Sequence, residues 1–228
     1  MADFTFAHRD EGFDNHIDKS IRHYSTLHDD IVKMSRYFVE DHTNVYDLGC
    51  STGKTLGAMI DQNRSFAPAC NYIGIEHAEG FRDDMQTRMR EYETDDLDLR
   101  FEDIRSADMY NASLITSIFT LQFMPRADRQ ETLNRVYEAL NPGGAFIFGE
   151  KTYSCSSKVQ DMLTFMYYDF KRESFDAKDI MDKEHTLRHM LKPNTWSEIN
   201  QMLEIAGFDS VQTFWQNHLF VGAIAIKS

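Results

Sequence analysis

Cysteine and long apolar runs are scarce in this chain. Its 228 residues include only three cysteines, an odd number at widely separated positions, Cys50, Cys70 and Cys155. This spacing fits neither a disulfide framework nor a zinc site, so we expect reduced thiols, a cytoplasmic location and no metal. No segment is apolar and long enough to span a bilayer, and the N-terminus lacks the basic and apolar stretches of a signal peptide. We therefore expect no membrane partner.

Positive charge is also in short supply. The chain has 24 lysines and arginines against 37 aspartates and glutamates, which gives a net charge of −13. Such a charge opposes broad electrostatic binding to the phosphate backbone of nucleic acids. Some basic residues could still form a local basic patch, or they could instead lie on a solvated helix face. These residues are Arg126, Arg129, Arg135, Lys171 and Arg172.

The most informative stretch is Val-Tyr-Asp-Leu-Gly-Cys-Ser-Thr-Gly, residues 45–53. Its first half reads as a buried strand that ends near Asp47, and in the following turn Gly49 and Gly53 allow positive φ and close approach of the backbone to a ligand. Tight strand-to-helix turns are where open α/β sheets bind nucleotides. A second strand ends in Glu76, roughly 20 residues later, the spacing at which a carboxylate meets ribose hydroxyls. The pattern predicts adenosine binding, and its Asp-x-Gly-x-x-x-Gly form resembles motif I of S-adenosylmethionine (SAM) dependent methyltransferases.

Two other interpretations of this turn stay open. It could be a purely structural strand–turn–helix. The triplet Gly53-Lys54-Thr55 also resembles the end of a phosphate-binding P-loop, but that motif needs a glycine about five residues earlier, where Leu48 stands. In addition, Asp47 would repel a triphosphate.

Strand and helix patterns alternate along most of the chain. Apolar runs predict strands, and amphipathic periodicity predicts helices between them. This alternation predicts an α/β fold with a seven-stranded, mostly parallel, Rossmann-like methyltransferase sheet that ends in an antiparallel hairpin with its turn at Gln216-Asn217. With 42% hydrophobic residues and no visible repeat or linker, residues 1–228 are expected to form a single SAM-binding domain. The expected strands are 44–48, 72–75, 97–102, 112–119, 145–150, 210–215 and 218–227, and the expected helices are 17–40, 52–63, 80–92, 126–140, 157–172, 178–190 and 196–206.

Two segments lie outside this alternation. Residues 1–43 are expected to form an N-terminal arm, irregular over residues 1–18, followed by the first helix. Residues 155–195 are expected to form a helical insertion over the ligand-binding face. The apolar side chains of this insertion could form a substrate lid, a homodimer surface or part of the core: Leu163, Met166, Tyr167 and Tyr168.

Several segments give the chain a family likeness. They are Phe119-Thr120-Leu121-Gln122-Phe123, Asn141-Pro142-Gly143-Gly144, Glu150-Lys151, Asp169-Phe170-Lys171-Arg172, Ala206-Gly207-Phe208 and Trp215-Gln216. Together with the turn at residues 46–51, they resemble the carboxy-S-adenosylmethionine (carboxy-SAM) synthases from about Tyr24 to the C-terminus. The resemblance implies an enzyme that converts SAM and prephenate to carboxy-SAM. Carboxy-SAM in turn serves modification of the tRNA wobble uridine, so tRNA would be only an indirect partner.

The resemblance also implies a SAM site assembled from several strand ends. Tyr24 would contact the ligand from the N-terminal helix, and Glu76 and His77 would meet its ribose and adenine side. Asp103 and Ile104 would flank the adenine. The full set expected to bind SAM or S-adenosylhomocysteine is Tyr24, Asp47, Gly49, Cys50, Ser51, Gly53, Glu76, His77, Asp103, Ile104, Ile118 and Phe119.

Two positions depart from the family's pattern. Ile118 stands where the family has an asparagine, just before its Phe-Thr-Leu-Gln-Phe segment. Glu184 aligns, after a one-residue gap, with the arginine that holds the extra carboxylate of carboxy-SAM. A glutamate there would repel that group, although Arg188, one helical turn on, could replace the arginine.

The sequence is therefore compatible with three functions. The leading hypothesis is a methyltransferase that moves the methyl group of SAM to an unidentified small molecule, largely by positioning donor and acceptor. The sequence identifies no catalytic residue, but His77 or His185 could act as a base if the acceptor must lose a proton. Because of Glu184 and Ile118, the protein is expected not to accumulate carboxy-SAM. The alternatives are carboxy-SAM synthesis and a non-catalytic SAM-binding protein.

Overall fold

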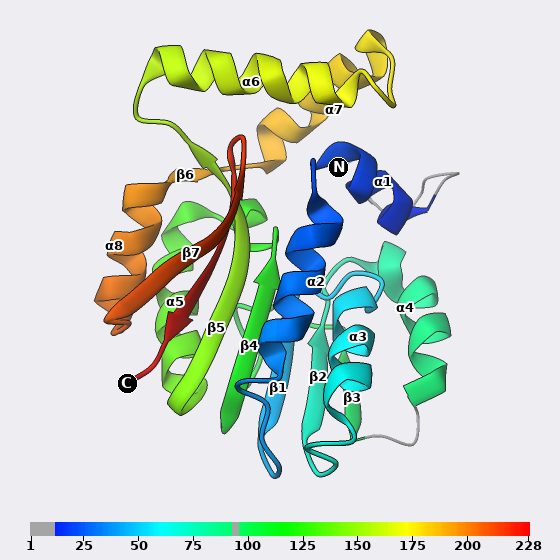
Figure 1. The fold of residues 1–228 in the computed structure, drawn as a ribbon, viewed down its shortest axis with the longest axis vertical. Helices are drawn as coiled ribbons and strands as arrows, with labels where there is room; N and C mark the ends of the chain where they lie inside the picture. The colour runs from blue at the N-terminus through cyan, green and yellow to red at the C-terminus, as the bar shows by residue number, and fades with distance from the viewer. Residues whose placement is uncertain (1–11, 93–95) are drawn as a thin grey trace.

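A mixed β-sheet runs through the centre of the molecule (Figure 1). The computed structural model describes residues 12–92 and 96–228. Along the sheet the strand order is β3-β2-β1-β4-β5-β8-β7, and the short strand β6 pairs with β5. Strand β8 runs antiparallel to both of its neighbours, and the other pairs are parallel. The strands are β1 Asn44–Leu48, β2 Asn71–Ile75, β3 Leu97–Arg100, β4 Ala112–Ile118, β5 Leu140–Tyr153, β6 Asn194–Thr195, β7 Ser210–Asn217 and β8 Phe220–Ile226.

This arrangement confirms the expected α/β fold with its antiparallel C-terminal hairpin. The seven expected strands form the main path of the sheet, and β6 is an eighth strand that no sequence pattern indicated. The α-helices of the described residues are α1 Phe13–Ser20, α2 Tyr24–Ser35, α3 Lys54–Asn63, α4 Arg82–Met89, α5 Arg126–Ala139, α6 Ser157–Lys171, α7 Ala177–Met190 and α8 Trp196–Ala206. Short 3-10 turns are η1 Glu79–Phe81, η2 Arg90–Tyr92 and η3 Leu121–Phe123.

Helices cover both faces of the sheet and create two apolar cores. Successive residues of a strand point to opposite faces. In β1, Val45 therefore packs with Leu27 of α2 and the residues of α3, whereas Tyr46 packs on the other face with Leu133 of α5 and Leu203 of α8. Residues of β1 are buried on both faces, which explains why the strand reads as a continuous apolar run.

The N-terminal region differs from its expected form. Residues 1–11 of the expected irregular arm lie outside the described residues, but Phe13–Ser20 is a helix and not irregular. The expected helix at 17–40 is instead divided between α1 and α2, because His23 adopts φ 60° and breaks the helical path. Tertiary contacts hold α1 in place: Phe13 packs edge-on against Phe81, with 4.9 Å between ring centroids, and Asp14 pairs with Arg88 at 2.6 Å.

Two strand boundaries also differ. Residues 141–144, expected to stop a helix, and Leu140, expected to be its last residue, belong to the beginning of β5. Gly143 there has φ 82°, and the pairing with β4 is irregular. The hairpin turn lies at His218-Leu219 rather than at Gln216-Asn217, since β7 extends to Asn217.

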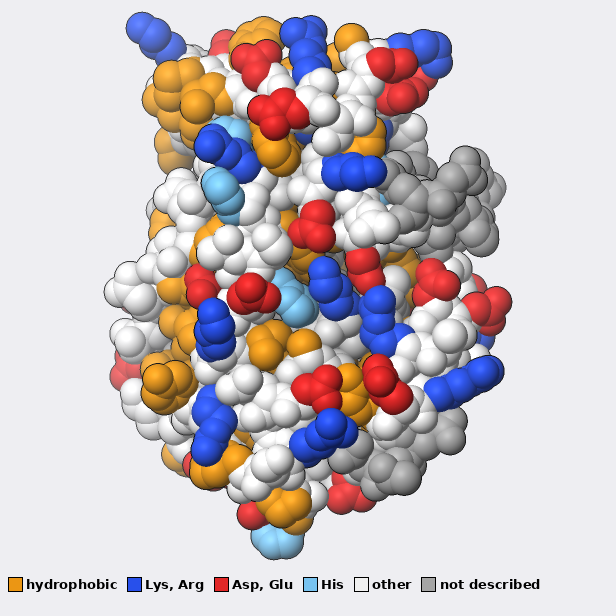
Figure 2. All heavy atoms as spheres, turned by 45° about the vertical axis from the view of Figure 1, so that its right-hand side comes forward, with side chains coloured by type: hydrophobic (Ala, Val, Ile, Leu, Met, Phe, Trp, Pro, Cys, Tyr) orange, Lys and Arg blue, Asp and Glu red, His pale blue; other side chains and the backbone are white. Residues whose placement is uncertain are grey.

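The segment 155–195 contains α6 and α7, which cross the upper end of the sheet in Figure 1. None of the helices within residues 12–92 and 96–228 combines the length and the apolar character needed to cross a membrane. On the face that Figure 2 shows, basic and acidic side chains are interspersed among the described residues and no extended basic patch is visible.

Candidate functional site

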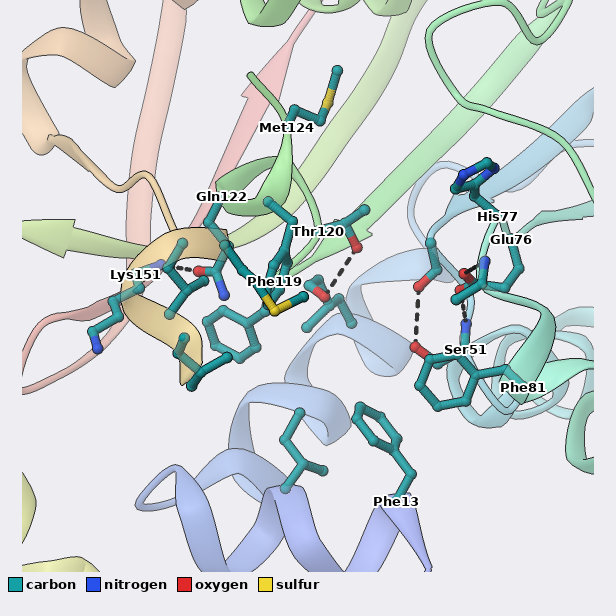
Figure 3. A pocket seen from close by; sticks show the side chains of 18 of the residues that line it. Phe13, Ser51, Glu76, His77, Phe81, Phe119, Thr120, Gln122, Met124 and Lys151 are labelled. Carbon is teal, nitrogen blue, oxygen red and sulfur yellow. Dashed lines mark hydrogen bonds between the residues drawn. The ribbon is translucent and has the colours of Figure 1, made fainter. Parts of the chain in front are cut away.

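A cavity of about 430 Å³ opens where the parallel strands end and α1 and α7 approach the sheet (Figure 3). Strand order reverses around β1 and β4, and ligands of open α/β sheets bind at such reversal points beyond the carboxyl ends of the strands. The volume lies in the range of small-molecule sites. Each of the five parallel strands along the main path of the sheet contributes to the wall: Gly49 and Ser51 after β1, Glu76 and His77 after β2, Asp103 and Ile104 after β3, Phe119 and Thr120 after β4, and Lys151 in β5.

The glycine-rich turn after β1 is held against β2 by its backbone. The N–H groups of Gly49 and Cys50 donate to the carbonyl oxygen of Ile75 at 2.7 and 3.2 Å. Gly49 has φ 75°, and a Cβ atom there would lie 2.3 Å from Oγ1 of Thr120. Glycine is therefore required both by the backbone conformation and by the close approach of the loop after β4.

Glu76 connects this turn to the end of β2. Its carboxylate accepts the backbone N–H of Ser51 at 2.9 Å and that of Ala78 at 2.7 Å (Figure 3). Burial raises the pKa of Glu76, and these backbone hydrogen bonds oppose the shift. The remaining lone pairs of the carboxylate are available to vicinal hydroxyls of a ribose, which fits the role expected from the sequence.

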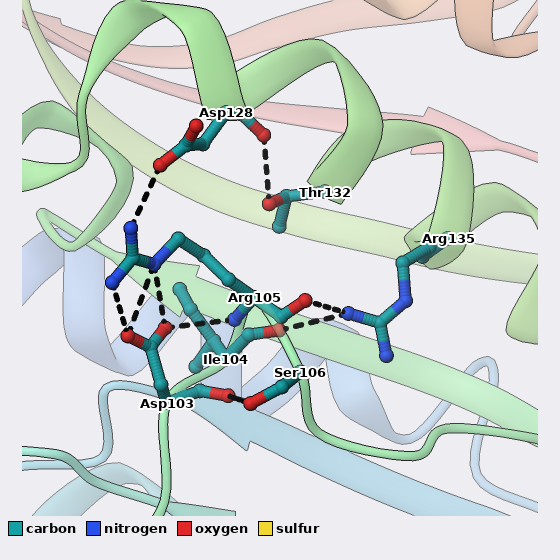
Figure 4. Close-up of polar contacts among 7 residues, drawn as sticks. All are labelled: Asp103, Ile104, Arg105, Ser106, Asp128, Thr132 and Arg135. Carbon is teal, nitrogen blue, oxygen red and sulfur yellow. Dashed lines mark hydrogen bonds and ion pairs between the residues drawn. The ribbon is translucent and has the colours of Figure 1, made fainter.

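The loop after β3 is braced from two sides (Figure 4). Arg105 donates to the carboxylate of Asp103 and to Asp128 of α5, at 2.6 and 2.8 Å. Arg135, also from α5, donates to the backbone carbonyls of Ile104, Arg105 and Ala107. The Arg105 guanidinium holds the pKa of Asp103 below its usual range, so this carboxylate is charged and fixed beside the cavity.

The centre of the cavity contains a strained aromatic residue. Phe119 follows β4 with φ 56°, a conformation that is rare for a bulky side chain. Its ring packs 5.5 Å from that of Phe220 and 6.2 Å from that of Tyr24, and its N–H donates to Gly149 at 2.7 Å. Backbone strain of this kind is concentrated at ligand sites, where the surrounding structure enforces it.

Two lysines and two further aromatic residues also line the cavity. They are Lys151, Lys183, Tyr167 and Phe220. The backbone N–H of Lys151 donates to Oε1 of Gln122 at 2.7 Å, which ties β5 to the loop after β4. Figure 3 shows Lys151 and Gln122 on the opposite side of Phe119 from Glu76.

The position of Glu184 corrects one expectation from the sequence. Glu184 does not line the cavity, and its carboxylate lies 3.9 Å from the ammonium of Lys171, which is buried. The preceding residue, Lys183, lines the cavity instead and contacts Nε2 of His16 and, at 3.4 Å, Oγ of Ser20. Adjacent residues of a helix differ by about 100° in direction, so a shift of one residue places a lysine, and not a glutamate, at the cavity wall. Arg188, the expected replacement cation, is exposed and outside the cavity lining.

The structure brings most, but not all, of the expected SAM-site residues to one cavity. Four residues are absent from the lining. Tyr24, Asp47 and Cys50 are buried, and Gly53, with φ 74°, immediately precedes α3. Thr116 donates to Asp47 at 2.9 Å, and burial raises the pKa of that carboxyl to about 7. The eight residues that line the cavity are Gly49, Ser51, Glu76, His77, Asp103, Ile104, Ile118 and Phe119.

A buried polar cluster supports the cavity from behind. Arg129 donates to Asn194 and to the carbonyl oxygens of Gln122 and Met124, at 3.2 and 3.0 Å for the two carbonyls. The carboxyl of Glu150 is fully buried in the same region, and its burial raises its pKa to about 8 despite the opposing charge of Arg129. This cluster fixes the loop that places Thr120 and Gln122 beside the cavity.

Sequence reasoning missed three charged residues of the site: Lys151, Lys183 and Arg105. Lys151 was noted only as part of a family-like segment, although its place at the end of a parallel strand was a usable signal. Lys183 carried no signal, because the alignment gap fell beside it. Of the two histidines considered as bases, His77 lines the cavity, and His185 is exposed outside it. Among the described residues, no group of histidine, cysteine and carboxylate side chains is suited to hold a metal.

Comparison with known proteins agrees with this geometry. A family model described as a methyltransferase domain matches residues 46–146. Carboxy-S-adenosyl-L-methionine synthase from Staphylococcus epidermidis is 37% identical over 216 residues, which cover 94% of this chain and 92% of that protein. The protein of the same name from a Shewanella species (strain W3-18-1) is 33% identical, over 100% of this chain and 94% of its own length. In fold, human N-acetylserotonin methyltransferase in complex with SAM is similar, with a TM-score of 0.57 and 15% identity over 90% of this chain and 52% of that one.

Proposed function

The chain belongs to the carboxy-S-adenosyl-L-methionine synthase family, and from this premise we propose that it attaches a carboxyl group to the methyl carbon of SAM. It is a SAM-dependent transferase with a class I methyltransferase fold, so the expectation of an enzyme is confirmed. Carboxy-SAM synthesis thus replaces methyl transfer as the leading hypothesis. The family resemblance makes prephenate the source of the carboxyl group.

The observation that supports this proposal is that Lys183, and not Glu184, lines the cavity. From the sequence, Glu184 was expected to face and repel the carboxylate of carboxy-SAM. Glu184 instead pairs with Lys171, and the ammonium of Lys183 reaches the cavity.

The charge balance of the two candidate ligands also supports the proposal. SAM carries a positive sulfonium beside its methyl group, which gains nothing from an ammonium group nearby. In carboxy-SAM, the methyl carbon has lost a proton and gained a carboxylate, and this negative group would accept hydrogen bonds from a lysine. We therefore assign Lys183 to the carboxylate of carboxy-SAM.

Replacement of Lys183 by methionine tests this assignment. Lys183→Met should weaken carboxy-SAM binding by about ten- to hundredfold, the effect of losing one hydrogen bond to a charged group, and should leave the Kd of SAM within about twofold of wild type. Lys178→Met is a matched control, because Lys178 is an exposed residue of the same helix that pairs with Asp182. Equal losses for SAM and carboxy-SAM in calorimetry would contradict the assignment.

Methyl transfer remains the second candidate function because of Ile118. This apolar side chain lines the cavity where the family has an asparagine, so one polar contact of that site is missing here. Under this candidate the purified enzyme would convert SAM to S-adenosylhomocysteine in the presence of an acceptor and would form no carboxy-SAM.

Further parts of the proposal concern the whole molecule. We propose that residues 1–228 form one SAM-binding domain, that tRNA is only an indirect partner, and that the chain works in the cytoplasm, where the free cysteines Cys50, Cys70 and Cys155 would stay reduced. We also propose a homodimer in which the outer surface of α6 contacts a second copy. This α6 surface consists of apolar residues whose exposed fractions lie between 38 and 66%: Val159, Met162, Phe165 and Met166.

A further inference from the structure

The alternation of side chains at the end of β5 separates two charged residues. Glu150 points to the buried cluster around Arg129, and the following residue, Lys151, points to the opposite face of the sheet, where it is one of the residues that line the cavity. The Lys151 ammonium lies 5.3 Å from the ring centre of Tyr167 and 5.7 Å from that of Phe220, its partner residue on β8. The ammonium thus lies beside two aromatic residues that also line the cavity.

Lys151 differs from the other two lysines of this region in its surroundings. Lys171 has the carboxylate of Glu184 at 3.9 Å, and Lys183 contacts His16 and Ser20. Within residues 12–92 and 96–228, no carboxylate lies within 4.0 Å of the Lys151 ammonium, and its side chain forms no hydrogen bond. Burial lowers the pKa of Lys151, and the more distant charge of Glu184 opposes that shift.

A cation in such a place is stabilised by an anion that enters with the ligand. Lys151 is half-buried, and an ammonium partly removed from water is stabilised when an anion enters as its partner. The rings of Tyr167 and Phe220 at the same end of the cavity add flat apolar surface beside that position.

We propose that Lys151 is a substrate-binding residue that pairs with a carboxylate of the second substrate, and that Tyr167 and Phe220 contact the unsaturated ring of that substrate. This proposal rests on the proposed function, since it concerns the molecule that supplies the carboxyl group. It assigns the two cavity lysines to different anions: Lys183 to the carboxylate attached to SAM, and Lys151 to a carboxylate that the second substrate keeps.

Calorimetry on the protein loaded with S-adenosylhomocysteine tests this proposal. The titrants are prephenate, phenylpyruvate and the uncharged methyl ester of phenylpyruvate. Lys151→Met should weaken binding of the two carboxylates by about ten- to hundredfold, with little change for the ester, and Lys151→Arg should restore part of the loss. Lys158→Met, an exposed lysine on α6, is the control that should bind all three as wild type does. The Kd of SAM, measured on each variant, should remain unchanged.

Each outcome of this titration decides a separate point. Wild-type affinity for the carboxylates in a folded Lys151→Met variant would overturn the role of Lys151, as would a wild-type protein that binds neither carboxylate. If the wild-type protein makes carboxy-SAM from prephenate, the proposed function survives either result. If carboxylate binding depends on Lys151 but no carboxy-SAM forms, the anion site stands and the proposed function fails.

Discussion

Replacement of Glu76 by glutamine separates two tasks that the structure gives to one carboxylate. Its two oxygens accept the N–H groups of Ser51 and Ala78, and its side chain lines the cavity. Glutamine keeps the shape but offers one acceptor oxygen, so its amide group would face a backbone donor. A buried donor left without a partner costs about 1–3 kcal/mol, and we expect the free energy of unfolding to fall by this amount.

The same substitution should weaken SAM binding. The charged carboxylate that would accept both ribose hydroxyl protons is lost, and the turn that carries Gly49 is less firmly held. We expect the Kd of SAM to rise by about ten- to hundredfold, and Glu76→Ala should produce a loss at the upper end of this range.

Isothermal calorimetry and chemical denaturation measure the two effects separately. Glu79→Gln is the matched control, because Glu79 is exposed and pairs with Arg82 at 2.6 Å, away from the turn. A folded Glu76→Gln variant with the wild-type Kd for SAM would refute the assignment of Glu76 to the ribose. A lower affinity with unchanged stability would refute the bracing role alone.

Three further predictions follow from local geometry. Gly49→Ala should lower the melting temperature and abolish SAM binding, because its Cβ would meet Oγ1 of Thr120 at 2.3 Å. A second change, Thr120→Ala, should recover part of the stability. A lack of recovery would contradict this cause. Burial raises the pKa of Glu150 from 4.5 to about 8, so the free energy of unfolding should decrease as the pH rises between these values. In denaturation experiments at a series of pH values, Glu150→Gln should reduce this dependence of stability on pH. An unchanged dependence would exclude Glu150 as its source. Phe165→Glu on the α6 surface should convert the proposed dimer to a monomer in sedimentation experiments, and a wild-type monomer would contradict the dimer.

The sequence predicted the parts of the fold that are dictated by local pattern. Strand β1 was placed at its observed bounds because it is buried on both faces and is followed by a glycine turn. The first half of helix α1, residues 13–16, was missed because its stability comes from distant partners: Arg88 for Asp14, and Phe81 for Phe13. Periodicity within the helix could not reveal those contacts.

The candidate site shows the same division. Glu76 was found because it ends the second strand roughly 20 residues after the glycine turn, and Asp103 was found because the family resemblance implied it. Lys183 was missed because the alignment around it contains a gap, and a helix turns by about 100° per residue. Only the contact of Lys183 with α1 and that of Glu184 with Lys171 fix which of the two side chains reaches the cavity.

The central claim is that this SAM site forms carboxy-SAM, and turnover with defined substrates tests it most directly. The purified wild-type protein should be incubated with SAM alone and with SAM and prephenate, and the nucleoside products identified by mass spectrometry. We expect carboxy-SAM to form only when both substrates are present, with little S-adenosylhomocysteine. Unchanged SAM in both samples, or conversion to S-adenosylhomocysteine without carboxy-SAM, would contradict the central claim.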